Sequence, residues 1–196
     1  MKGSDKRGKI MKTALGLFAE RGFHGVPMTM IAEKAEVAIG TIYLYFASKD
    51  ALIKELFMEV DEKINGTIQE EHLIDEPIRE RYLHFTRAII EYFIAHPLHF
   101  RYLEQYIGSP YGVSQRRDAL LGKLDRGDPF FLLFEEGMSN QILKDLPMVV
   151  LFSLGIGSLM FLVRDHILGF VELNDSLIKQ AAEACWDGIE RRINGH

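Results

Sequence analysis

Apolar residues recur every three to four positions along almost the whole chain, and this spacing constrains the fold more than any other feature. Ile10, Ala14, Leu17 and Phe18, for example, follow one face of a helix. Strand-like alternation bounded by tight turns is absent from the sequence. We therefore expect an all-α fold. With 196 residues, 47% of them hydrophobic, the chain can form one sizeable core, or a small module attached to a larger one.

Caps and turn residues divide the first part of the chain into short helices. Gly22 would end the first helix as a C′ glycine, Pro27 suits the first turn of the second, and Ser48 would cap the fourth. The helices expected here cover about Asp5–Arg21, Met28–Ala35, Ile39–Tyr45, and Lys49 to the region of Glu70.

The segments after Glu76 are longer. We expect a loop at residues 108–112 and a break at residues 126–129, where the sequences are GSPYG and RGDP. The helices expected in this part cover about Ile78–Ala95, Leu98–Ile107, Arg116–Leu124, Phe130–Leu143, Pro147–Leu168 and Asp175–Ile193.

Two short helices on either side of a tight turn near residues 36–38 predict a helix-turn-helix. At about 100° per residue, the second helix would bury Ile39, Ile42 and Phe46. Its other side would carry Gly40, Thr41 and Leu44, with Tyr43 and Tyr45 on the flanks. A helix that only faces solvent would typically carry Lys and Glu on that side instead.

This composition suits a surface that contacts DNA. Tyr and Thr hydroxyls can bind phosphate oxygens, and Gly40 would let the backbone approach a duplex closely. Leu44 and the methyl group of Thr41 could contact thymine methyl groups in the major groove. Lys49 adds a positive charge at the start of the next helix. The alternative at this point is that the two tyrosines simply fill gaps in the core.

The distribution of charge agrees with a DNA-contacting head. The net charge is −5, but residues 1–50 carry eight Lys/Arg and five Asp/Glu, a net +3. The remainder carries 15 and 23, a net −8. A basic head on an acidic body is expected if only the head meets phosphate.

The stretch from about residue 8 to residue 57 resembles the DNA-binding domain of tetracycline-repressor (TetR) type regulators. The segments LFAERGF, IAEKAEV, GTIYLYF and SKDAL occur in the order and at the spacing typical of that family. The resemblance implies a homodimeric, ligand-responsive transcription factor, most often a repressor released from a palindromic operator. It also implies that the following residues contact DNA: Thr29, Ala38, Ile39, Gly40, Thr41, Tyr43, Leu44, Tyr45 and Lys49.

Three positions depart from the family pattern. Val26-Pro27 stands where a Thr-Thr pair is common, so the hydroxyl cap of the second helix is missing. Glu36 stands where the turn usually has glycine, and a positive φ there would strain its backbone. Ile39 replaces a polar base-reading side chain found in some members, which shifts readout towards apolar contacts and DNA shape. These departures keep an alternative open: a helical small-molecule-binding or protein-interaction module that no longer reads DNA.

We expect two functional parts, a helix-turn-helix DNA-binding domain at residues 1–47 and a helical ligand-binding and dimerisation domain at residues 48–196. Ser153 and Gly157 are small residues four positions apart, which would let another helix approach closely. Leu177, Ala181, Ala184, Cys185 and Ile189 share one face of the last helix. We therefore expect a homodimer through the two C-terminal helices, the alternative being that both helices only complete the core of a monomer.

The middle helices are rich in aromatic residues, and the family resemblance implies a ligand cavity between them. An aromatic and apolar lining would suit a hydrophobic or planar small molecule, although aromatic residues at this spacing also fit a plain core. The candidate lining consists of Tyr102, Tyr106, Phe134, Met138 and Phe161.

No motif indicates an enzyme, a cofactor or a metal site. The sequence lacks GxSxG, HExxH, GxxxxGK[ST] and GxGxxG, and no set of ligands accompanies His96 and His99. The lone Cys185 fits a reducing compartment, so we expect a cytoplasmic protein. The longest apolar run, residues 148–163, has 16 residues, fewer than the roughly 20 that a membrane span needs. We therefore expect no membrane partner and a buried helix at this run.

Overall fold

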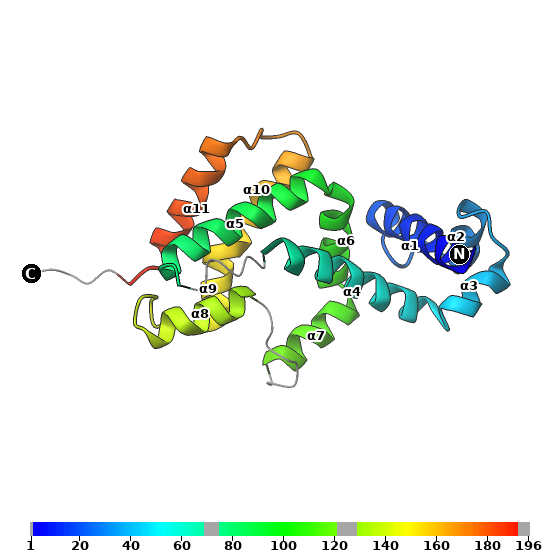
Figure 1. Cartoon of the computed structure of the whole chain (residues 1–196), viewed down its shortest axis with the longest axis horizontal. Helices are drawn as coiled ribbons and strands as arrows, with labels where there is room; N and C mark the ends of the chain where they lie inside the picture. Colours follow the sequence, from blue (N-terminus) through cyan, green and yellow to red (C-terminus); the bar gives the residue numbers. More distant parts are fainter. Residues whose placement is uncertain (1, 69–74, 121–128, 192–196) are drawn as a thin grey trace, which may run out of the picture. The chain divides into compact units, whose positions relative to one another are not determined.

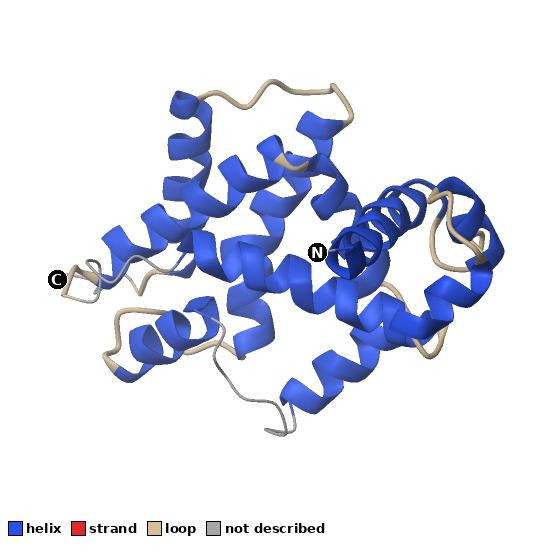
Figure 2. Cartoon of the chain, turned by 45° about the vertical axis from the view of Figure 1, so that its right-hand side comes forward, coloured by secondary structure: helices blue, strands red, loops and turns tan. Residues whose placement is uncertain are grey.

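The computed structural model describes residues 2–68, 75–120 and 129–191, and its regular elements are helices joined by loops (Figures 1 and 2). Within these ranges there is no β-strand, only one isolated bridge between Leu143 and Glu190. The expected all-α fold is confirmed.

The N-terminal helices follow the predicted bounds closely. They are α1 (Lys2–Arg21), α2 (Met28–Lys34), α3 (Ile39–Tyr45) and α4 (Lys49–Ile68). The later elements are α5 (Ile78–Ala95), α6 (Pro97–Ile107), α7 (Pro110–Leu120), α8 (Pro129–Ser139), α9 (Met148–Phe152), the π-helix η2 (Ser153–Gly157), α10 (Ser158–Ile167) and α11 (Asp175–Ile189). The predicted ends at Glu70, Leu124 and Ile193, and most of the predicted break at 126–129, lie outside the described residues.

The chain forms two compact units. Unit 1 contains residues 1–63 and 96–124, and unit 2 contains residues 64–95 and 125–196. The first boundary falls inside α4 and the second between α5 and α6. These units describe packing, and the functional division at residue 47 stays a prediction. Because α1 packs against α6, the helices α6 and α7 belong to the same unit as α2 and α3.

The core of unit 1 joins aliphatic residues to a chain of aromatic rings. Phe18 packs edge-on against Phe23 at 5.2 Å, and Phe23 contacts both Tyr102 and Tyr111. The Tyr102 hydroxyl donates to the Ile53 carbonyl at 2.6 Å. The rings therefore connect the end of α1 with α6 and α7, and a hydrogen bond fixes α6 to α4.

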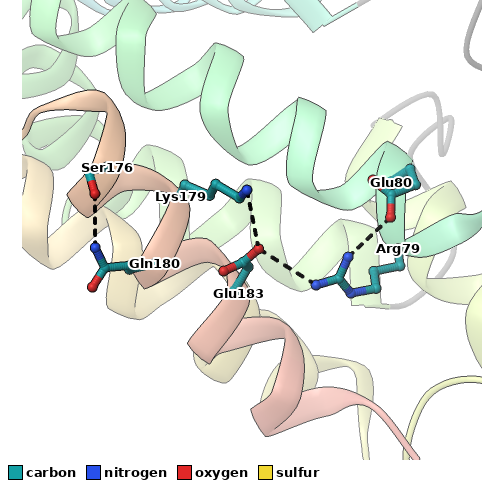
Figure 3. Close-up of polar contacts among 6 residues, drawn as sticks. All are labelled: Arg79, Glu80, Ser176, Lys179, Gln180 and Glu183. Carbon is teal, nitrogen blue, oxygen red and sulfur yellow. Dashed lines mark hydrogen bonds and ion pairs between the residues drawn. The ribbon is translucent and has the colours of Figure 1, made fainter.

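The core of unit 2 is built around α5, which packs against α8, α10 and α11. Tyr82 of α5 lies 5.2 Å from the Trp186 ring, and its hydroxyl donates to the Gly155 carbonyl at 2.5 Å. On the surface, Glu183 of α11 pairs with Lys179 and with Arg79 of α5, in a network that Figure 3 shows. Exposed pairs of this kind contribute little to stability, so the buried rings hold these helices together.

The structure contradicts the loop predicted at residues 108–112, because α7 begins at Pro110. The Ser109 side chain accepts a bond from the Gly112 amide at 3.5 Å, and Pro110 occupies the first helical position. A serine cap followed by proline is a helix-start signal. All six prolines of the chain in fact precede or begin a helix.

The run from Met148 to Ile167 forms one 20-residue helix whose middle turn is the π-helix η2. It is long and apolar enough to cross a membrane by length and composition alone, with a mean hydropathy of 1.7. Only 22% of its most apolar window is buried within the chain. The expected buried helix is therefore wrong for the isolated subunit, because most of this apolar surface has no cover from the subunit itself.

Candidate nucleic-acid interface

The turn between α2 and α3 is a Schellman motif centred on Glu36. The Val37 amide donates to the Ala32 carbonyl and the Glu36 amide to the Glu33 carbonyl, both at 3.0 Å. Glu36 has a φ of 53°, so the positive φ considered from the sequence is present. Its carboxylate accepts a bond from Lys9 Nζ at 2.5 Å, and this bond lowers the pKa of Glu36. Lys9 therefore partly offsets the negative charge at the turn.

The outer surface of α3 is an arc of four residues, Ile39, Tyr43, Gly40 and Leu44, which we call the reading arc. Tyr43 is 52% exposed and Leu44 is 84% exposed, whereas Ile42 and Phe46 are fully buried. Gly40 is exposed as well. The wheel prediction is thus confirmed for Ile42, Phe46, Gly40 and Leu44.

Ile39 departs from that wheel prediction because it is 39% exposed rather than buried. Helical side chains lie back over the preceding turn of their own helix. Ile39 is the first residue of α3 and follows the turn after α2, so it has no such turn beneath it. It therefore forms the edge of the reading arc, beside Tyr43.

Gly40 is not required by the fold. Its φ lies outside the left-handed region, and a Cβ built on it would meet no atom within 4 Å. Glycine disfavours helix formation relative to alanine, yet no neighbouring group excludes a side chain here. The subunit would therefore tolerate a side chain at residue 40, and without one the backbone there is open to a close approach by another molecule.

The other predicted DNA contacts lie around the reading arc. Thr29 and Ala38 are exposed, and Thr41 and Tyr45 are half-buried. Neither α2 nor α3 has a side-chain cap, since Pro27 and Ala38 precede them. The Ser48 cap of α4 is confirmed by its 3.1 Å bond from the Ala51 amide.

Lys49 is held by the protein itself. Its Nζ donates to the Phe23 carbonyl, and partial burial lowers its pKa. The next residue, Asp50, accepts a bond from the Tyr111 hydroxyl at 2.5 Å, which raises the pKa of Tyr111 to about 12. The start of α4 is therefore tied to the loop after α1 and to α7.

The five residues predicted to line a ligand cavity fall into different units. Tyr102 and Tyr106 belong to the core of unit 1, where Tyr106 stacks on Phe57 at 4.1 Å. Phe134, Met138 and Phe161 belong to unit 2. Phe134 is fully buried and Met138 is half-buried, whereas Phe161 is 59% exposed beneath the Arg164 guanidinium.

The part of the chain that the structure describes holds no group of three or more His, Cys, Asp or Glu side chains placed to bind a metal ion. The rings of His96 and His99 stack with their centroids 5.3 Å apart. Burial lowers the pKa of His99, and Lys63 and His96 lower it further, while Glu59 opposes them.

Comparison with known proteins decides the family. The family model described as bacterial regulatory proteins of the tetR family matches residues 10–56. The model described as the tetracyclin repressor-like C-terminal domain matches residues 77–190, more than half of the chain. The chain belongs to the TetR family.

Several relatives match this TetR family member over nearly its whole length. An HTH-type transcriptional regulator from Haemophilus influenzae is 23% identical over 188 residues, covering 96% of this chain and 97% of its own. A TetR family protein from Vibrio parahaemolyticus has a solved structure that matches with 31% sequence identity and a TM-score of 0.72. The match covers 95% of this chain and 100% of that protein. A TetR family regulator from Marinobacter aquaeolei shares the fold, with a TM-score of 0.84 at 21% identity and coverage of 98% and 100%.

TetR family members are DNA-binding transcriptional regulators with a helix-turn-helix, and they are not enzymes. The family expected from residues 8–57 is therefore confirmed, and it extends through the C-terminal helices. Membership in this family also argues against a membrane span at Met148–Ile167. This helix resembles a membrane-spanning helix in its length and composition only.

Sequence reasoning missed several contacts within unit 1 between residues far apart in the sequence. Tyr111 and Lys9 belong to no motif, and the family segment LFAERGF, which ends at Phe23, does not indicate what Phe23 contacts. The partners of Tyr111, Phe23 and Lys9 lie 61, 26 and 27 residues away: Asp50, Lys49 and Glu36. The Ser-Pro pair at residues 109–110 was a sequence signal related to these contacts, because it predicts the start of the helix that carries Tyr111.

Proposed function

We propose that this TetR family regulator is a cytoplasmic, homodimeric repressor that inserts α3 of each subunit into the major groove of a palindromic operator. A hydrophobic small molecule bound to the C-terminal part of the chain would release the operator. The DNA contacts proposed are the reading arc and its neighbours Thr29, Ala38, Thr41, Tyr45 and Lys49. The reading arc carries this proposal, because its exposed leucine, isoleucine and tyrosine lie together beside a glycine that the fold does not require, as expected of a contact surface.

Gly40→Ala separates a role in DNA binding from a role in folding. The added methyl group meets nothing in the subunit, so we expect thermal stability to be unchanged or to rise by up to about 1 kcal/mol. At a close interface with DNA the same methyl group would overpack the contact, which would cost about 1–3 kcal/mol of binding free energy. Operator affinity should then fall roughly tenfold or more, as measured by fluorescence anisotropy at fixed salt.

The matched control is Gly16→Ala in α1, another helical glycine of unit 1 with open space at its Cβ. This variant should keep wild-type operator affinity. Equal affinity for the Gly40→Ala variant and the wild type would contradict the proposed docking of α3. A wild-type protein without salt-dependent binding to DNA from upstream of its own gene would instead favour the module that no longer reads DNA.

The proposed homodimer rests on the exposed apolar side of the Met148–Ile167 helix. Leu154 and Phe161 are exposed on this side, and the small residues Ser153, Gly157 and Ser158 are exposed near them on the same helix. On α11 the exposed or half-buried side includes Leu177, Ala181 and Ala184, while Ile189 is in the core. We assign Phe161 to this dimer surface rather than to a ligand lining. A dimer also places two reading helices on successive major grooves, roughly 34–36 Å apart.

The proposed effector can be followed through Trp186, the only tryptophan of the chain. Its ring is buried in unit 2 against Tyr82, whose other neighbour is Phe134. A hydrophobic compound that binds in unit 2 should change Trp186 fluorescence and weaken operator binding at the same concentrations. A compound that shifts the emission but leaves operator affinity unchanged would bind without regulating, contrary to the proposal.

A further inference from the structure

The reading arc lacks the side chains that normally recognise bases through hydrogen bonds. Arg and Lys read guanine, Asn and Gln read adenine, and Asp or Glu accept from cytosine. Residues 28–48 contain no Arg, Asn, Gln or Asp, and their only Lys is Lys34 of α2. The two acids in this range are Glu33 of α2 and Glu36, and Glu36 is bonded to Lys9. On the reading arc itself, the Tyr43 hydroxyl is the only side-chain group able to form hydrogen bonds.

What the reading arc offers instead is apolar surface. Leu44 is more exposed than any other large hydrophobic residue in the described part of the chain, and Ile39 lies at the other edge of the arc. Burial of such a side chain in a complex is favourable. In the major groove the apolar target is the 5-methyl group of thymine, because the remaining base edges there are hydrogen-bond donors and acceptors.

Gly40 strengthens the case for Leu44. The two residues are four positions apart, so they occupy neighbouring places on the same side of α3. Without a Cβ at residue 40, the helix backbone can come close to the base edges beside Leu44. A short side chain such as leucine needs this approach, whereas a long Arg or Lys could reach the bases from further away.

We propose that this regulator recognises its operator mainly through thymine methyl groups, with Leu44 as the residue that contacts them and Ile39 in support. The inference rests on the proposed docking of α3 in the major groove. It predicts half-sites with thymine at the positions that face Leu44, and discrimination that depends on a methyl group rather than on a hydrogen bond.

Substitution of deoxyuridine for thymidine tests this proposal, because uracil lacks only the methyl group and keeps every hydrogen-bonding edge. An operator is first selected from random duplexes with the full-length protein, and each thymidine of a half-site is then replaced in turn. We expect one or two positions at which the replacement weakens binding about fourfold, the value of one buried methyl group. The same replacement in both half-sites should weaken binding roughly fifteenfold.

Leu44→Ala provides the second arm, and its exposed position makes a folding defect unexpected. This variant should bind the thymidine and deoxyuridine operators with equal affinity at the sensitive positions. Met58→Ala, at an exposed apolar residue of α4 in the same unit, should keep the full preference for thymidine.

Three outcomes would overturn the inference. The first is a deoxyuridine operator bound within twofold of the thymidine operator at every position. The second is a Leu44→Ala variant that retains the full penalty for deoxyuridine. In either case the proposed docking can still hold, with base recognition carried by other groups. The third is a wild-type protein that binds no duplex, which would overturn the proposed function as well.

Discussion

Leu154→Arg should convert the proposed homodimer to a monomer and weaken binding to the full operator about a hundredfold or more. Leu154 lies near the middle of the Met148–Ile167 helix and is 42% exposed in the isolated subunit. Its neighbours three and four positions away in both directions carry no charge, so nothing on that helix would neutralise the new arginine. At a symmetric interface two such arginines face each other without partners, which is strongly unfavourable.

The loss of operator affinity follows from the loss of bivalent binding. Linked half-site contacts strengthen binding by about 10²–10⁴ over a single contact. The variant should therefore bind a single half-site as well as the wild-type subunit does, while its advantage on the palindrome disappears. Sedimentation velocity and fluorescence anisotropy would measure the two effects.

Leu132→Arg is the matched control, because Leu132 is a leucine of the same unit with similar exposure, 49%, on α8. It should remain a dimer with normal operator affinity. A dimeric Leu154→Arg variant would show that the two C-terminal helices do not form the interface. Dissociation of both variants would point to a general effect of added charge instead.

Gly112→Ala should produce a large loss of stability. A Cβ at residue 112 would stand 2.7 Å from Ile107 Cα and 2.9 Å from the Ile107 carbonyl oxygen. Both are backbone atoms, so the clash is relieved only if the corner between α6 and α7 moves. Overpacking of this kind costs about 1–3 kcal/mol, and for a chain of this length about 1 kcal/mol corresponds to a change of 2–4 °C in Tm.

Gly108→Ala in the same corner gives the comparison. The nearest atom to its Cβ would be the Glu104 carbonyl oxygen at 3.5 Å, an ordinary contact, and its backbone is right-handed helical. Its Tm should stay close to that of the wild type, while the Tm of Gly112→Ala should fall by about 2–12 °C in a thermal melt. Equal Tm values for the two variants would show that the backbone between α6 and α7 can shift at little cost and does not fix the position of α7.

The positions of the helices were largely predictable because periodicity and caps are local signals. The bounds of α3 and α5 agree with the prediction at both ends, and Gly22 ends α1 with the expected positive φ. The α7 helix was predicted to begin near Arg116 rather than at Pro110, because the residues GSPYG were interpreted by their turn propensity alone. Ser109 and Pro110 also fit a helix start, and every proline of this chain either directly precedes a helix or is its first residue.

The exposed surface of α3 was predictable from a helical wheel, except at its first residue. A helical wheel assumes a helix that continues in both directions. It therefore placed Ile39 among the buried residues, although Ile39 begins α3 and no helical turn of α3 precedes it. The role of Lys49 in holding the Phe23 carbonyl depends on a loop 26 residues earlier, and local patterns carry no information about it.

The π-helical turn at Ser153–Gly157 was not predictable from the apolar pattern. Within this turn, the Gly155 carbonyl accepts a hydrogen bond from the hydroxyl of Tyr82 in α5. Gly155 also leaves room for the rings of Phe134 and Tyr82, which would lie 3.0 and 3.6 Å from a Cβ at that residue. These are tertiary contacts, and the two glycines of SLGIG were only a weak sign of them.

The discontinuity of unit 1 has a consequence for any attempt to isolate the operator-binding head. A fragment that ended after α4 would lose α6 and α7, and with them the ring contacts of Phe23 and Phe57. Such a fragment would expose aromatic surface to solvent and would tend to aggregate. We therefore expect that this fragment would not fold independently. The cooperative unfolding of α1–α3 should include α6 and α7, and amide exchange in α1 should increase when α6 is lost.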